Sequence, residues 1–233
     1  MEKYLQKLVS FYPVSSRQKN VEVLIDYIEA HFKNAGLITS KKTYDGVFNL
    51  YCSTNNSKIS KLLLQAHIDV VPGESQVFSV REGKYFGRGV YDMLYATACY
   101  MHLCDELGDS IKNLDLAFML SGDEELGGFN GVKRMLGEGY GAKVCILPDA
   151  GQGMGTLNVA AKGIYNCTVR IHGKSHHGSR PWEGDGAAIK LASFLVETNL
   201  LFNTASPDNS TMTVAKLSAG DADNQGPAFA DAI

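Results

Sequence analysis

Short apolar runs that alternate with helical patterns are the feature of this sequence that most limits its fold. The apolar runs span residues 47–52, 61–66, 114–120 and 143–147, and polar residues, Gly or Pro bound them. Such runs are typical of strands buried in a sheet. Helical patterns lie between several of them, notably at residues 93–107 and 129–136. This alternation predicts an α/β fold: a layered domain with a largely parallel central sheet and helices on both faces.

The N-terminal segment has a helical pattern of its own. Its apolar positions are Leu5, Leu8, Val9 and Tyr12, then Val21, Leu24, Ile25, Ile28 and Phe32. These residues recur at the spacing of one helix face, and Gly36 supplies a stop signal after the second set. Two amphipathic helices are therefore predicted to open the chain.

The pattern changes near residue 158. Residues 165–171 and 211–217 alternate as strands, and residues 185–198 have helical spacing. We therefore expect a first domain over residues 1–158 and a second unit of different build over residues 159–233. Residues 228–233 begin another strand pattern that no turn follows, and an exposed strand edge is normally paired or covered. The sequence is thus expected to be truncated at its C-terminus.

Composition and charge exclude several classes of protein. Hydrophobic residues at 45% and charged residues at 20% are ordinary globular values and exclude a disordered or collagen-like chain. The 22 basic and 25 acidic residues form no long run of one sign, so neither nucleic acid nor a membrane surface is expected as a partner. The sequence shows no bilayer-spanning stretch and no signal-peptide core, and its five cysteines contain no Cys-x-x-Cys pair. A cytoplasmic protein with reduced thiols is predicted.

Polar residues follow or lie between the predicted strands at four places. They are His67-Ile68-Asp69, the segment Gly87–Asp92, Asp123-Glu124-Glu125 and Pro148-Asp149. Ligands of parallel α/β sheets bind beyond the carboxyl ends of the strands, so these groups are expected to converge on one edge of the sheet. One imidazole and at least four carboxylates would then meet there.

Such a cluster of carboxylates predicts a divalent metal ion, because like charges raise one another's pKa unless a positive charge lies between them. One His with Asp and Glu suits zinc, cobalt or manganese better than calcium. Asp69 lies two residues after His67 on the same face of an extended segment, where it can accept the second ring N–H. Each piece also has a plainer interpretation. Asp92 could cap the following helix and Asp149 could be a turn residue.

Four separated strings resemble a known family. They are Leu64–Pro72, Tyr85–Met93, Asp123–Glu125 and Pro148-Asp149, in this order. They resemble the co-catalytic, dinuclear zinc peptidase and deacylase family of acetylornithine deacetylase, succinyl-diaminopimelate desuccinylase, aminoacylase and glutamate carboxypeptidase. The resemblance runs from the first helix to the last residue. It implies a zinc hydrolase catalytic domain over residues 1–158, with its C-terminal portion missing, and part of an inserted α/β lid or dimerisation domain over residues 159–233.

The resemblance also implies a role for each motif residue. His67 and Asp149 would hold one Zn²⁺, Glu125 would help hold a second, and Asp92 would bridge both. Glu124 would be the general base, and Asp69 would orient the ligand histidine.

In the lid, Gly173, His177, Ser179 and Pro181 match the family's Gly-x-x-x-His-x-Ser-x-Pro segment. In relatives that histidine stabilises the oxyanion in the partner subunit's active site, which implies a homodimer. His176 beside it is the lesser candidate.

The function expected from this resemblance is metal-dependent hydrolysis of an amide bond in an N-acyl amino acid or small peptide by a zinc-activated water. The alternative is a non-catalytic or incomplete relative that binds metal or dimerises. Two departures bear on the choice: Leu94-Tyr95 stands where relatives usually have Lys-Gly, and no histidine after His177 supplies the family's last metal ligand. Glycines at 137–141 and 151–155 invite a dinucleotide-binding interpretation, but strand patterns follow both, so turns are favoured.

Overall fold

The computed structural model describes residues 1–73, 77–149, 151, 153, 155–202 and 208–219. The chain divides into two compact units, Met1–Thr156 and Leu157–Ile233. None of the helices in the described part of the chain has the length and apolar character needed to span a bilayer.

A five-stranded mixed sheet forms the centre of the first unit. Its strands are β1 (Ile38–Tyr44), β2 (Val47–Ser53), β3 (Ile59–His67), β6 (Leu116–Ser121) and β7 (Gly141–Ile146). They lie in the order β1-β2-β6-β3-β7, with β3 parallel to both β6 and β7, whereas β2 runs antiparallel to β1 and β6. The predicted α/β class is confirmed. The edge strand β1 is a strand that the apolar runs did not indicate, because its side chains are polar and partly exposed.

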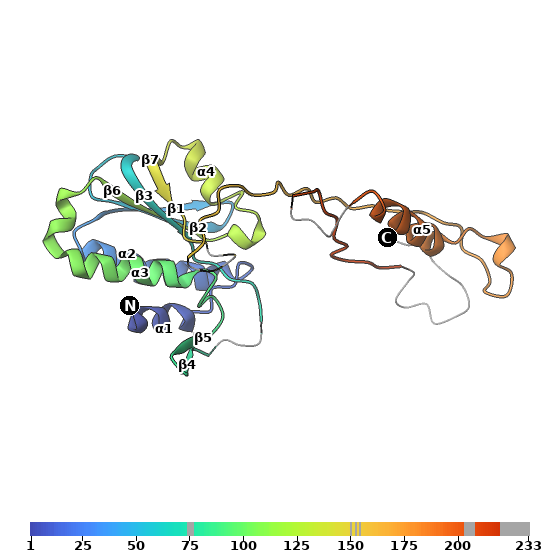
Figure 1. The fold of residues 1–233 in the computed structure, drawn as a ribbon, viewed down its shortest axis with the longest axis horizontal. Helices are drawn as coiled ribbons and strands as arrows, with labels where there is room; N and C mark the ends of the chain where they lie inside the picture. The colour runs from blue at the N-terminus through green and yellow to red at the C-terminus, as the bar shows by residue number, and fades with distance from the viewer. Residues whose placement is uncertain (74–76, 150, 152, 154, 203–207, 220–233) are drawn as a thin grey trace. The chain divides into compact units, whose positions relative to one another are not determined.

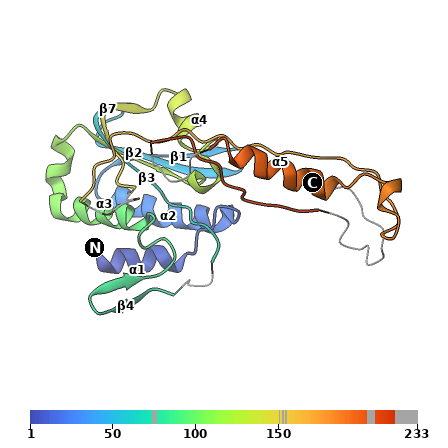
Figure 2. The same cartoon turned by 45° about the vertical axis from the view of Figure 1, so that its right-hand side comes forward.

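Helices cover both faces of this sheet. They are α1 (Glu2–Ser10), α2 (Gln18–Asn34), α3 (Leu94–Leu107) and α4 (Val132–Gly137). Figure 1 shows α1, α2 and α3 below the sheet and α4 above it, and the turned view in Figure 2 shows the same layers. The two helices predicted at the N-terminus are present and bury their apolar faces, but α1 ends at Ser10, so Tyr12 of the predicted set lies outside it.

The side chains of β6 explain why the sheet needs helices on both faces. Every residue of this strand is buried. Phe118 packs in the large core between the sheet and helices α1 to α3. Its ring stacks on Phe32 with ring centroids 4.8 Å apart. Its neighbour Met119 points to the opposite face and packs with Met135 of α4. A run without polar alternation is thus the mark of a strand covered twice.

Smaller elements complete the first unit. A two-stranded hairpin pairs β4 (Ser79–Arg81) with β5 (Lys84–Phe86). Short 3-10 segments, η1 (Gly108–Asn113) and η2 (Glu124–Leu126), follow α3 and β6. The glycines at 137–141 connect α4 to β7, a helix-to-strand connection that lacks the strand-to-helix order of a phosphate loop.

The second unit contains α5 (Ala187–Asn199) and η3 (Pro181–Glu183). The helix predicted at 185–198 is confirmed. The strands predicted at 165–171 and 211–217 are wrong: within the described residues neither segment forms a strand, Ile171 makes only an isolated bridge, and Tyr165 is 90% exposed. Residues 228–233 lie outside the described residues.

Candidate metal centre

Three neighbouring strands end at the edge of the sheet where the candidate site lies. His67 is the last residue of β3 and pairs with Ser121, the last residue of β6. The segment η2 follows β6, and Asp149 follows the end of β7. Because these three strands are parallel, their carboxyl ends share one edge, and side chains that follow them lie close together.

His67, Asp92 and Asp149 form one cluster of possible metal ligands. Each offers one ligand atom, and these atoms lie within 4.8 Å of one another. Among the described residues this is the one group of three or more such side chains. One imidazole nitrogen with two carboxylate oxygens is a donor set that zinc, cobalt and manganese accept. The residues present therefore fit a divalent metal ion.

The His67 imidazole is buried among acidic groups. Its Nε2 lies 2.9 Å from Asp92 Oδ1 and 3.9 Å from Glu124 Oε2. Burial by itself lowers its pKa, but the hydrogen bonds and charges of Asp69, Asp92 and Glu124 outweigh burial and raise the pKa to about 9. The surrounding carboxylates thus favour the protonated, positively charged form of the ring.

Glu124 and Glu125 stand beside the cluster in η2. Burial raises the pKa of both carboxyl groups, and the nearby carboxylate of Asp92 raises both further, against the opposing charge of His67. The Glu124 side chain is still 50% exposed. A solvent-accessible carboxyl group with a raised pKa, next to a ligand cluster, is suited to exchanging a proton with water.

The fully buried carboxylate of Asp69 joins three segments of the chain. Its Oδ1 accepts a hydrogen bond from the Glu124 backbone N–H at 3.1 Å, and its Oδ2 accepts one from Glu125 N–H at 3.3 Å. The backbone carbonyl of Asp69 lies 3.0 Å from His67 Nδ1, and its Oδ1 lies 3.5 Å from the same nitrogen. Asp69 therefore sets the position of η2 and of the His67 ring together.

Ser15 is a supporting residue that sequence reasoning missed. Its hydroxyl donates to Asp69 Oδ2 at 2.7 Å, and both side chains are buried. Its backbone N–H donates to Val70 O at 3.1 Å, and Val70 N–H donates back to Pro13 O at 3.0 Å, which holds the two segments side by side. A serine between the two N-terminal helices has no local pattern that reveals a partner 54 residues away.

His177 belongs to the second unit. It is exposed, and its Nδ1 lies 2.8 Å from the hydroxyl oxygen of Ser179. His176 is only partly exposed, with Nδ1 3.4 Å from Lys174 O. Of the two rings, His177 is the one that contacts Ser179, the serine of the Gly-x-x-x-His-x-Ser-x-Pro motif.

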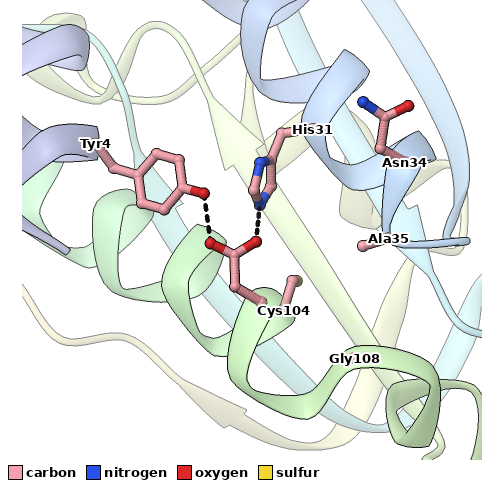
Figure 3. A pocket seen from close by; sticks show the side chains of 7 residues that line it. Tyr4, His31, Asn34, Ala35, Cys104 and Gly108 are labelled. Carbon is pink, nitrogen blue, oxygen red and sulfur yellow. Dashed lines mark hydrogen bonds and ion pairs between the residues drawn. The ribbon is translucent and has the colours of Figure 1, made fainter.

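A pocket of about 350 Å³ lies between α1, α2 and α3 and contains none of the predicted ligands. Figure 3 shows its centre, where one carboxylate meets Tyr4 and His31. This carboxylate is Asp105, which accepts a hydrogen bond from Tyr4 OH and lies 3.3 Å from His31 Nε2. Burial and the bond to Asp105 raise the pKa of Tyr4 to about 12. These contacts tie the three helices together.

Residues 63–215 match the family described as peptidase family M20/M25/M40. This segment covers most of the chain, including His67, Asp92, Glu124 and Asp149. The chain belongs to this family. The resemblance that the four motifs indicated is therefore confirmed.

Relatives and solved structures agree with this membership of M20/M25/M40. Succinyl-diaminopimelate desuccinylase of Rickettsia typhi is 28% identical over 258 residues, covering 98% of this chain and 66% of the relative. The same enzyme of Rickettsia akari is 28% identical over 246 residues, covering 93% of this chain and 63% of the relative. The chain thus spans somewhat less than two thirds of these relatives' length.

Two solved structures share the fold. A tripeptidase from Staphylococcus aureus has a TM-score of 0.64 at 17% identity and covers 99% of this chain and 63% of its own. An M20 family metallo-carboxypeptidase from Sulfolobus solfataricus has a TM-score of 0.60 at 17% identity and covers 82% of this chain and 48% of its own.

Proposed function

We propose that this protein is a metal-dependent hydrolase that cleaves an amide bond of an N-acyl amino acid or small peptide. One observation carries the proposal: the ligand atoms of His67, Asp92 and Asp149 lie within 4.8 Å of one another in a chain of the M20/M25/M40 family. The raised pKa of Glu124, beside this cluster, supports hydrolysis over simple metal storage.

The proposed ligands divide between two zinc ions. His67 and Asp149 would hold one, Glu125 would help hold the other, and Asp92 would serve both; cobalt or manganese could take the same places. When bound, such a metal pair lowers the pKa of a water molecule towards ~7 and polarises the amide carbonyl. Asp69 orients His67 and, through its two backbone bonds, keeps the Glu124–Glu125 turn at the site.

Proton transfer is assigned to Glu124. This carboxylate takes the proton of the attacking water and passes it to the leaving amine. His177 is assigned as the donor to the oxyanion that develops on the carbonyl, and the motif around it supports this role.

Several finer features belong to the same proposal. The substrate class follows the printed names of the relatives, which are a desuccinylase and peptidases. A homodimer through residues 159–233 is proposed because the assignment of His177 needs a second subunit. A cytoplasmic location is supported by the cysteines, all five of which are free.

A non-catalytic metal-binding relative is the second candidate. It is favoured by the cluster itself, because three donors with water as a fourth ligand satisfy one zinc ion without any turnover. Zinc content measured together with a panel of N-acyl amino acids and dipeptides separates the two candidates. Metal binding with hydrolysis supports the enzyme, and metal binding without hydrolysis of any panel member supports the alternative.

The sharpest test compares Glu124→Gln with Glu125→Gln. We expect Glu124→Gln to keep its zinc content and to lower turnover by a factor on the order of 10² or more, because it removes general-base transfer. Glu125→Gln is the matched control, with the same chemical change one residue away, and is expected to lose metal. Loss of zinc from Glu124→Gln by elemental analysis would mean that the two glutamates are exchanged in these roles. Unchanged zinc binding by His67→Ala would refute the metal centre.

A further inference from the structure

Two tyrosines flank the candidate ligand Asp92 and reach the segment that carries Asp149. Tyr91 directly precedes Asp92, and Tyr95 lies in the first turn of α3. The Tyr95 hydroxyl donates a hydrogen bond to the carbonyl oxygen of Pro148. The Tyr91 hydroxyl accepts one from the backbone N–H of Gly153 at 3.0 Å. The two bonds fall on either side of Asp149 in the sequence.

The segment with Asp149 has little else to hold it. The ladder between β3 and β7 ends at the pair Leu64 and Ile146, and residues 147–149 have no regular structure. Pro148 has no N–H to donate. Among the described residues of this segment, the bond from Gly151 N–H to Asp149 O is internal to it. Apart from the local bond of Thr156 N–H to Gly153 O, the two tyrosine bonds are thus the hydrogen bonds recorded in the described part of the chain that tie residues 147–149, 151 and 153 to the rest of the first unit.

We infer that Tyr95 and Tyr91 are positioning residues that hold Asp149 at ligand distance from Asp92 and His67. The inference rests on the proposed function, since it concerns the same metal site. One short stretch, residues 91–95, carries one ligand and also fixes the backbone of another. The tyrosine bonds therefore oppose a shift of either ligand. Neither tyrosine belongs to the cluster of possible ligands, so we assign both a role through Asp149.

The test is zinc affinity of the full 233-residue chain, measured with Zn²⁺ against a chromophoric chelator. The variants are Tyr95→Phe, Tyr91→Phe and the double variant. Removing groups that orient a ligand typically lowers metal affinity by about 10–100-fold, and because Tyr95 acts through the backbone of the residue before the ligand we expect about tenfold for Tyr95→Phe. A smaller loss is expected for Tyr91→Phe, whose bond lies farther along the chain, and a larger one for the double variant.

Tyr100→Phe is the matched control. Tyr100 lies on the same helix and its hydroxyl also donates to a backbone carbonyl, Gln65 O at 2.9 Å. It makes no bond to the Asp149 segment, so its loss is expected to lower the stability of the metal-free chain and to leave zinc affinity within about twofold of wild type. Urea unfolding of each metal-free variant reports the stability separately. The Tyr91 bond lies on an exposed segment, so Tyr91→Phe still tests the inference if Tyr95→Phe does not fold.

Three outcomes would overturn the inference. Wild-type zinc affinity in Tyr95→Phe, Tyr91→Phe and the double variant, with a weakened His67→Ala, refutes the inference and leaves the proposed metal site intact. An equal loss of affinity in Tyr100→Phe shows that affinity follows overall stability and refutes the positioning role. Equal zinc binding by wild type and His67→Ala refutes the metal site and this inference together.

Discussion

The hydroxyl of Ser15 is expected to stabilise the protein through one buried hydrogen bond, and Ser15→Ala tests this directly. The acceptor is Asp69 Oδ2 at 2.7 Å, on a carboxylate that is 0% exposed. The substitution removes one donor and leaves the carboxylate with its two backbone bonds from Glu124 and Glu125. Water cannot replace the lost donor without opening the structure.

The expected loss follows from the chemistry of that bond. A hydrogen bond to a charged group contributes about 1.5–3 kcal/mol, and a buried acceptor that stays without its partner places the loss in the upper part of this range. Total stabilities of about 5–15 kcal/mol make this a large fraction. With an m value of ~2 kcal/mol/M, the urea midpoint is expected to fall by about 1 M.

The assay is urea unfolding of the metal-free chain in the presence of a chelator, so that metal binding does not contribute. Ser60→Ala is the matched control. Ser60 is also buried, but its hydroxyl makes no hydrogen bond of standard geometry among the described residues, although the Tyr51 side chain lies near it. Its removal is expected to leave the midpoint unchanged or raise it slightly. If Ser15→Ala unfolds at the same urea concentration as wild type and Ser60→Ala, the bond from Ser15 to Asp69 does not stabilise the fold.

Two further predictions concern other parts of the chain. Folding raises the pKa of Tyr4 from 10.0 to about 12, so its contribution to stability is present below pH 10 and is lost as the pH rises through 12. Tyr4→Phe is expected to be less stable at neutral pH but to lose less stability over that alkaline range, as urea midpoints at several pH values would reveal. His177→Ala is expected to leave the thermal unfolding temperature unchanged, because the ring is exposed. In a catalytically active preparation, the same substitution is expected to slow hydrolysis of an N-acyl amino acid about 10²–10³-fold. An unchanged rate would remove His177 from the mechanism.

Periodicity predicted the elements whose burial is regular. The helices with Leu5 to Phe32 were predicted because burial follows the helical repeat, and the doubly covered strand around Phe118 was predicted because its apolar run is uninterrupted. It failed at β1, whose polar residues pair at an exposed edge, and at 165–171, where the alternating segment forms no strand among the described residues. Alternation indicates that a segment suits a sheet, but pairing depends on what lies beside it.

The sequence by itself determined the α/β class, the membership of the M20/M25/M40 family and the order of the motifs that end the strands. Only the tertiary structure decided which side chains meet: Ser15 with Asp69, and Tyr95 with Pro148. The sequence shows Tyr95 at a position where the family resemblance leads one to expect Gly, but it does not show that Tyr95 contacts Pro148. The physical reason is distance along the chain. Local patterns report burial and backbone preference over a few residues, whereas these contacts join positions 54 and 53 residues apart, and packing alone brings them together.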